Sequence, residues 1–349
     1  MAIHRPCYCT REDVCRALDI ADTARAFAQV DRLLQAAADG IDADTHRVFY
    51  PITETRYKDW PNEQSPIPWR LWLDADQLIS LTSLVSGGIS LTPGQYVLWP
   101  PIGPPYSAIE INLAASAAFN VGATHQRSVA LTGTWAGCAV QIAAATSLAE
   151  PLDGTETEVD VTNGSGIGVG DLIVVDAERM LVSDRGWLDS GQTLQSPMAA
   201  SAAAGTVAVT SGSAFARDET LLLDGERMLI TDVAGNTLIV KRAWDGSVLA
   251  EHTGSTIYAS RRLTVRRAQT GTSATTHSDG STVNCWIPPA LLSQLAIAET
   301  INAVEQERSA YARVIGSGET ATEARGAGLA DLRARACTAY ARKARTRVV

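Results

Sequence analysis

The chain has 349 residues, of which 46% are hydrophobic and 19% are charged, and its net charge is −9. This composition is typical of a globular protein large enough for two domains and excludes a disordered chain. The negative charge excludes a general nucleic-acid binder, because recognition of phosphates requires clustered cations. The sequence lacks the apolar runs of a signal peptide or a membrane span, so we expect neither secretion nor membrane insertion.

Two helices are predicted at the start of the chain. Thr10 followed by Glu12 and Asp13 marks the beginning of a short helix over 11–18, because a hydroxyl cap and early acids satisfy the first free N–H groups. Apolar residues at helical spacing predict a longer helix over about 23–43. Residues 52–147 instead alternate short apolar runs with Gly and Pro turns, which predicts a small β-region.

The middle of the chain contains an internal duplication. Residues 157–184 and 205–232 align without a gap at an offset of 48, and 11 of 28 positions are identical. Residues 238–259 match 263–284 with one inserted residue. The two first halves therefore precede the two second halves along the chain.

This order is most simply explained by nesting of one copy inside the other. We expect an inner copy over 205–259 and an outer copy formed by 157–190 and 263–284. The inner copy would lie at a hairpin tip of the outer copy, because hairpin tips tolerate insertions. Asp224–Gly225 predicts one tight hairpin turn within the inner copy.

Helices return after the β-rich middle. Pro289 favours the first turn of a helix over about 289–312, and a last helix is predicted over 329–345. The sequence thus predicts an α+β fold. The N- and C-terminal helices pack together with the small β-region in one helical domain, 1–147 and 286–349, which carries a large all-β insertion over 148–285.

Motifs of catalysis and nucleotide binding are missing from the sequence. It contains no GxGxxG opening a helix, no GxxxxGK, no GxSxG and no HExxH. Gly164–Gly170 is glycine-rich, but it precedes a strand-like apolar run that offers no helix N-terminus to a phosphate. We therefore expect no enzymatic activity, no catalytic residue and no cofactor.

Two repeated pairs of acids are the strongest catalytic candidates. Asp176 and Glu178 recur as Asp224 and Glu226 in the second copy. Two carboxylates could serve glycoside hydrolysis or calcium binding. A turn role is favoured, because these acids flank a predicted hairpin turn where they would be exposed and could pair with the arginine that follows each glutamate.

Histidine and cysteine give weaker metal hypotheses. His252 and His277 are also equivalent in the two copies, but no Cys or acid repeats beside both at ligand spacing, so turn roles are favoured. Cys7, Cys9 and Cys15 lack a fourth ligand at CxxC or HxxxH spacing. No metal site is therefore predicted.

The flanks of the duplicated segment resemble a known protein family. YCTREDVCRALDI (8–20), AAADGIDADTHRVFYP (36–51) and GLADLRARACTAYARKAR (328–345) are similar to the head-to-tail adaptor, or head–tail connector, proteins of long-tailed bacteriophages. The resemblance covers 1–147 and 286–349. Compact members of that family lack the insertion over 148–285.

This resemblance implies a structural virion protein, assembled in the host cytoplasm and located in the head–tail neck. Its subunits would form a ring, a homo-dodecamer, that joins the portal protein to a stopper or other neck or tail protein. DNA would pass through the lumen without specific binding, which an acidic lumen favours. In the family the C-terminal segment docks to the portal, which implies an interface here formed by Tyr340, Arg342, Lys343, Arg345 and Arg347.

Two other functions remain open. The duplicated unit could be a carbohydrate-binding or host-recognition module with Trp187 and Trp244 near loops, although Trp244 aligns with Gln269 and the aromatic residue is not repeated. The repeated acids could also serve a hydrolase. The C-terminal cations could instead form a solvated helix face.

Overall fold

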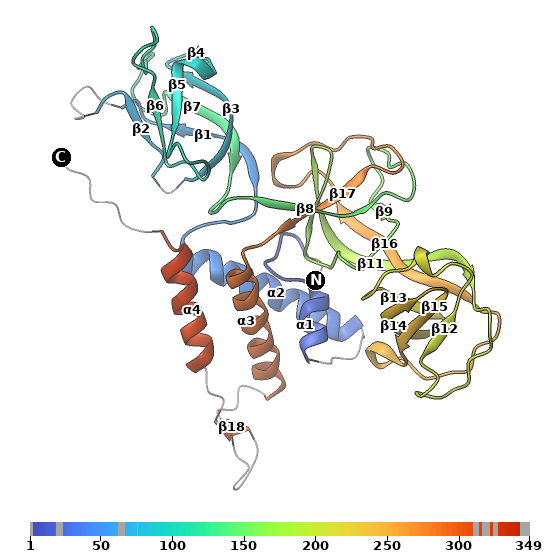
Figure 1. Cartoon of the computed structure of the whole chain (residues 1–349). Coiled ribbons are helices and arrows are strands. Elements are labelled where there is room, and N and C mark those ends of the chain that lie inside the picture. The colour runs from blue at the N-terminus through green and yellow to red at the C-terminus, as the bar shows by residue number, and fades with distance from the viewer. Residues whose placement is uncertain are drawn as a thin grey trace. The chain divides into compact units, whose positions relative to one another are not determined.

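The computed structural model describes residues 3–18, 24–61, 67–74, 76–309, 314–315, 322–323 and 327–342 (Figure 1). The chain forms two compact units, each built from segments that are distant in sequence. Unit 1 comprises Met1–Asp39, Ile142–Gln269 and Ser273–Leu332, and unit 2 comprises Gly40–Gln141, Thr270–Thr272 and Arg333–Val349. These units divide the chain differently from the boundaries suggested by the sequence, because two helices contribute to both.

The helices of the described residues are α1 (Arg11–Leu18), α2 (Ala24–Thr45), α3 (Ala290–Arg308) and α4 (Ala327–Tyr340). The start of α1 is a reciprocal cap, as the sequence predicts. The Asp13 N–H donates to Thr10 Oγ1 and the Thr10 N–H donates to Asp13 Oδ2, both at 3.1 Å. In unit 1, α2 is joined to α3 through Glu307, which accepts hydrogen bonds from Gln29 and Arg32.

Unit 2 contains two antiparallel sheets that share one apolar core. The strand orders are β1-β7-β3-β4 and β2-β6-β5. Burial alternates strictly along β7, so one face of that strand contributes to the core. The strands are β1 (Ile52–Lys58), β2 (Arg70–Trp72), β3 (Leu78–Ser86), β4 (Ile89–Leu91), β5 (Tyr96–Trp99), β6 (Ala108–Ile111) and β7 (Val129–Trp135).

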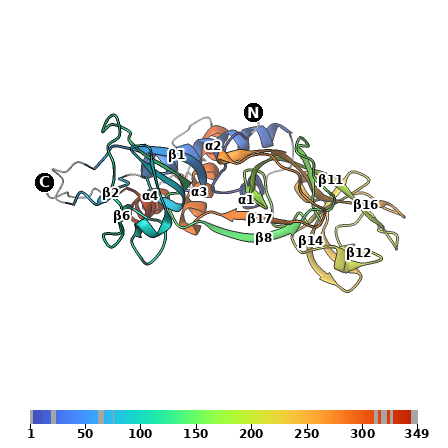
Figure 2. The same ribbon diagram turned by 90° about the horizontal axis from the view of Figure 1, so that it is seen from above.

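Unit 1 is dominated by a ten-stranded sheet with the order β12-β15-β14-β13-β16-β11-β10-β17-β8, in which β9 pairs with β16. Its strands are β8 (Gln141–Ser147), β9 (Glu158–Asp160), β10 (Leu172–Val175), β11 (Glu178–Thr193), β12 (Thr206–Ala208), β13 (Thr220–Leu223), β14 (Glu226–Ala234), β15 (Thr237–Lys241), β16 (Thr256–Arg266) and β17 (Thr282–Ile287). Figure 2 shows β8 beside β17 at one edge. The short strands β18 (Val314–Ile315) and β19 (Thr322–Glu323) pair separately.

The two copies of the duplicated module meet in this one sheet. Strands β11 and β16 pair over most of their length and run side by side in both views (Figures 1 and 2). The inner strands β12 to β15 lie between β11 and β16 in the chain, so the inner copy is an insertion at the far end of that pair. The copies are continuous, because β16 pairs with β11 and also with β13 of the inner copy.

The predicted fold class is wrong in its helical part. The structure is mostly β, with 36% strand and 23% helix, and the four helices of the described residues form no separate adaptor domain. The N-terminal segment is instead held on the outer copy. The N–H groups of Cys7 and Arg11 donate to the carbonyls of Gly170 and Val169, both at 3.0 Å. Sequence periodicity identified the helices, but it could not show that the chain around them packs on strands.

Candidate functional site

The repeated acids form part of a buried ionic cluster in the inner copy, which we call the inner clamp (Asp224, Glu226, Arg242 and His252). Glu226 opens β14 directly after the Asp224–Gly225 turn, and its side chain is fully buried. Arg242 donates to both Glu226 carboxylate oxygens, from Nε at 2.6 Å and from Nη2 at 2.7 Å. Such a bidentate pair has a defined orientation as well as a favourable charge interaction.

His252 completes the inner clamp and contacts both of its acids. Its Nδ1 lies 2.9 Å from Asp224 Oδ2 and its Nε2 lies 3.0 Å from Glu226 Oε2. Each ring nitrogen faces a carboxylate oxygen, so both must carry hydrogen for both contacts to be hydrogen bonds. The buried Glu226 carboxylate is therefore contacted by both Arg242 and His252, in a site where an unpaired carboxylate would be costly.

The outer copy repeats this geometry in the outer clamp (Asp176, Glu178, Arg267 and His277). Arg267 donates to Glu178 at 2.7 and 2.8 Å. His277 lies 2.7 Å from Asp176 Oδ2 and 3.0 Å from Glu178 Oε2. The correspondence extends to the backbone, since the N–H groups of the residues after each arginine, Ala243 and Ala268, donate to the glutamates at 2.9 and 3.1 Å.

Both clamps also tie distant loops to the sheet. Arg242 donates to the carbonyls of Ala199, Ala204 and Ala250, and Arg267 donates to those of Asp153, Glu156 and Thr275. The arginines therefore join the segment before each module to its second half. Each clamp therefore has a structural role, because it holds two distant segments of the chain together.

Burial alone would raise the pKa of Glu178 and Glu226, because it disfavours the charged carboxylate. The hydrogen bonds from arginine, backbone N–H groups and histidine outweigh this effect. The pKa of each glutamate is consequently lowered to about 2. Both glutamates are ionised at neutral pH and have no proton to donate.

The structure corrects the sequence-based interpretation of these residues. The side chains of Asp176 and Asp224 are exposed as expected, but Glu178 and Glu226 are buried and form ion pairs with the distant Arg267 and Arg242. The histidines are buried as well. The sequence does contain one signal for these ion pairs, since Arg242 and Arg267 repeat at the same offset as the two histidines.

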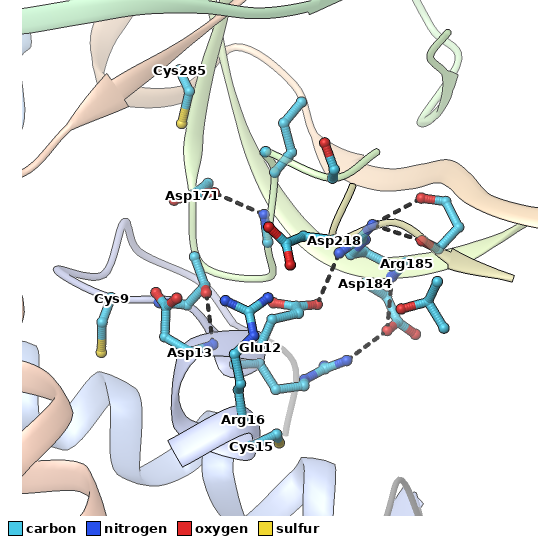
Figure 3. Close-up of a pocket in the computed structure, with 18 of the residues that line it drawn as sticks. Cys9, Glu12, Asp13, Cys15, Arg16, Asp171, Asp184, Arg185, Asp218 and Cys285 are labelled. Carbon is cyan, nitrogen blue, oxygen red and sulfur yellow. Dashed lines mark hydrogen bonds and ion pairs between the residues drawn. The ribbon is translucent and has the colours of Figure 1, made fainter. Parts of the chain in front are cut away.

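A cavity of about 510 Å³ lies within unit 1, between α1, the loop of residues 164–171 and the inner copy. Figure 3 shows Glu12, Asp13 and Arg16 from α1 on one wall and Asp171 and Cys285 on another. Its volume is in the range of small-molecule pockets. Trp187 and Trp244, the aromatic residues proposed for sugar binding, also line this cavity.

The glycine-rich loop forms one wall of the cavity. It is rich in glycine because its backbone approaches the N-terminal segment closely. The Val169 N–H donates to Glu12 Oε2 at 2.8 Å. A Cβ added at Gly168 would lie 2.5 Å from the Cβ of Thr10, so a side chain at this position would force a shift. The glycines thus serve backbone packing, and the loop leads into β10, as the sequence predicts.

Asp171 ends this loop at the cavity wall. One of its carboxylate oxygens accepts the Gly168 N–H at 2.8 Å. Burial raises its pKa to about 7. Burial also raises the pKa of the Cys7 thiol to about 12, and it raises the pKa of Cys9 and Cys285, so these thiols are neutral. Within the described residues, no group of three or more His, Cys, Asp and Glu side chains could hold a metal ion.

Only part of the proposed portal interface lies within the described residues. Tyr340 packs edge-on against Phe49, with ring centroids 5.7 Å apart, and the Arg342 N–H donates to the Thr45 carbonyl at 3.0 Å. The Arg342 side chain is exposed. Lys343, Arg345 and Arg347 lie outside the described residues.

No protein family model matches the chain, and no curated protein or solved structure resembles it significantly. Among the described residues, no helix is both long and apolar enough to cross a membrane.

Proposed function

We propose that this chain is a structural protein of a long-tailed phage, a head-to-tail adaptor located in the virion neck. It forms a ring that joins the portal to the next neck or tail protein and lets DNA pass through its lumen. The observation that carries this proposal is the resemblance of residues 8–20, 36–51 and 328–345 to that family. The net charge of −9 is compatible with a lumen along which DNA slides without binding.

The exposure of α4 supports its role in docking. Ala336 is the single fully buried side chain among those described along this helix. Tyr340 is held by Phe49, while Arg335 and Arg342 face solvent. A helix anchored at few points and bearing exposed cations is suited to a groove in a partner.

The repeated clamps support a structural role for the middle of the chain. The acids and histidines that could have been reactive are committed to internal ion pairs in both copies. Duplication of such a cluster repeats a folding element, and the clamped glutamates cannot act as general acids.

Mixing the purified chain with portal protein tests the proposal. We expect a ring on the portal in negative-stain images and a complex of matching mass. A chain truncated after Arg342 should fold normally and lose portal binding, whereas Arg217→Ala, which removes an exposed cation of the inner copy, should retain it. A chain that stays monomeric and does not bind the portal protein, even at high concentration, would contradict the proposal.

Carbohydrate binding is the second candidate, favoured by a surface other than the one that carries Trp187 and Trp244. On the three-stranded sheet of unit 2, Trp72 and Trp99 lie on either side of Ala108. The Arg70 guanidinium lies over both rings, 5.2 and 5.4 Å from their centroids. Aromatic faces beside a paired cation are suited to sugar rings and hydroxyls.

A glycan array with the whole chain distinguishes this candidate. Binding should be abolished by Trp99→Ala and retained by Trp187→Ala. An array without signal, or a signal that both variants retain, would contradict the hypothesis that this sheet binds sugars.

A further inference from the structure

The two copies differ at one pair of cross-strand positions. In the inner copy, β13 and β16 pair at Leu221 and Ala259, and two residues further along, Arg261 faces Glu219. In the outer copy, β10 and β17 pair at Ile173 and Cys285. The same register places Ile287 opposite Asp171. The acid is therefore kept in both copies, while the arginine is present only in the inner one.

The inner copy shows what this position holds. Arg261 donates to both carboxylate oxygens of the buried Glu219, at 2.6 and 2.9 Å. Its Nη2 also donates to the Ala214 carbonyl at 2.6 Å. The guanidinium carbon lies 5.3 Å from the centroid of the Phe215 ring. A carboxylate, a carbonyl and an apolar face together form a complete guanidinium site.

The outer copy retains the components of this site without the arginine. At the offset of 48, Asp171 corresponds to Glu219, Gly166 to Ala214 and Ile167 to Phe215. All three outer residues line the cavity of about 510 Å³. So does Ile287, whose side chain cannot donate a hydrogen bond. The position filled by the Arg261 guanidinium in one copy is thus adjacent to a cavity in the other.

Among the residues that the structure describes, no Lys or Arg side chain forms a hydrogen bond or a salt bridge with Asp171. Its contacts there are the Gly168 N–H and the Cys285 thiol. The nearby Arg185 is committed elsewhere, because its Nη2 donates to the carbonyls of Gly164 and Ser260. An acid at a cavity wall without a counter-ion is a favourable place for an external cation.

We propose that this cavity binds a guanidinium group, which takes the place beside Asp171 that Arg261 occupies beside Glu219. Two sources present the same chemistry: a free small molecule that bears a guanidinium, or an arginine side chain of a partner protein. The Gly166 carbonyl provides a further acceptor, and the Ile167 side chain provides an apolar contact in place of the Phe215 ring.

Binding should depend on pH, because Asp171 must be ionised to hold a cation. The charged and titratable groups that face it are Glu12 and Asp13 from α1, Arg185 from β11, Cys285 from β17, and Cys7 and Cys9 from the N-terminal segment. Burial and the two acids favour the protonated form of Asp171, whereas the hydrogen bond from the Gly168 N–H and the charge of Arg185 favour the ionised form. Guanidinium binding should therefore strengthen as pH rises through about 7.

Titration calorimetry of the whole chain with agmatine, a small guanidinium compound, tests the proposal. We expect saturable binding that weakens roughly tenfold or more in Asp171→Asn, because a charge-assisted bidentate pair is lost. Asp218→Asn, which changes another acid of the same cavity, should bind normally. Equal binding by wild type and Asp171→Asn, or no saturable binding by the folded wild type, would overturn the proposal.

A second variant identifies the source of the group. Ile287→Arg places a guanidinium where the inner copy has Arg261, so it should raise the melting temperature and abolish agmatine binding. If this folded variant also fails to associate with portal or with other copies of the chain, the natural occupant is a partner's arginine. If association is unchanged, the occupant is a small molecule. Agmatine binding that survives Ile287→Arg would contradict the proposed position.

Discussion

The inner and outer copies have kept the same clamp and changed the loops around it. In both, an exposed aspartate with a left-handed backbone precedes the buried glutamate, at φ 51° for Asp176 and φ 48° for Asp224. In both, the residue after the arginine is also left-handed, at φ 50° for Ala243 and φ 54° for Ala268. Such conformations are unfavourable for residues with a Cβ. At the two alanines, the hydrogen bond that each N–H donates to the clamp glutamate offsets this cost.

The loops differ according to what covers them. Gly170 of the outer copy, at φ 105°, lies against the N-terminal segment, where an added Cβ would be 3.2 Å from that of Cys7. Its equivalent in the inner copy, Asp218, is also left-handed but has an exposed side chain. The comparison indicates that the module requires the clamp for its fold. The sequence of the loop at Gly170 or Asp218 instead depends on whether another segment packs against it.

Removing a clamp arginine should have the largest effect on stability. Arg242→Ala and Arg267→Ala each leave a buried glutamate without its main counter-ion, which typically costs about 3–5 kcal/mol. Urea denaturation measures the free energy of unfolding, and Arg217→Ala, at an exposed site, should change it by less than about 0.5 kcal/mol. If the free energy of unfolding fell by less than about 1 kcal/mol in one of the two variants, the two clamps would not be energetically equivalent, contrary to their matching geometry.

Acid should weaken both copies through the same groups. The pKa of Glu178 and Glu226 is lowered to about 2 in the folded chain. Their contribution is therefore present above the pKa of an unfolded glutamate, near 4.3, and is lost as pH falls toward 2. It amounts to at most about 3 kcal/mol for each glutamate. Denaturation curves between pH 2 and pH 6 measure the slope, which Glu226→Gln should reduce by the share of one glutamate; an unchanged slope in this variant would contradict the assignment.

Exchanging the loop residues should have a smaller effect, and the effect should differ between the two copies. Gly170→Asp should destabilise the chain by about 1–3 kcal/mol, because the new side chain meets Cys7 and the backbone is strained. Asp218→Gly should be nearly neutral, since relief of strain offsets the greater freedom of the unfolded chain. Melting temperatures compare the two variants. A similar loss in both would show that the loops do not differ in packing.

Excising the inner copy should have the smallest effect on the outer one. Thr193 and Thr256 are the last paired residues of β11 and β16, so residues 194–255 can be replaced by an Asn-Gly turn. Hydrogen exchange should show that the amides of β10 and β17 remain protected. Loss of that protection would show that the copies fold as one cooperative unit.

The sequence predicted the features that depend on local chemistry. The Thr10 cap, the Asp224–Gly225 turn and the strand after the glycine-rich loop each follow from a few adjacent residues. The clamps could not be predicted in this way, because Glu178 and His277 are 99 positions apart. Burial reverses the usual expectation for a glutamate beside a turn, and it depends on which loops cover that turn. The helical domain was wrong for a similar reason, since periodicity does not identify the surface that a helix contacts.

The pairing of β11 with β16 also determines how the chain would respond to mechanical force. These are the two strands through which the polypeptide enters and leaves the inner copy, and they are hydrogen-bonded to each other. Tension applied to the ends of the outer copy is borne by that pairing and does not reach residues 194–255 until the two strands separate. The inner copy is therefore mechanically shielded, and under load it should be the last part of the module to unravel.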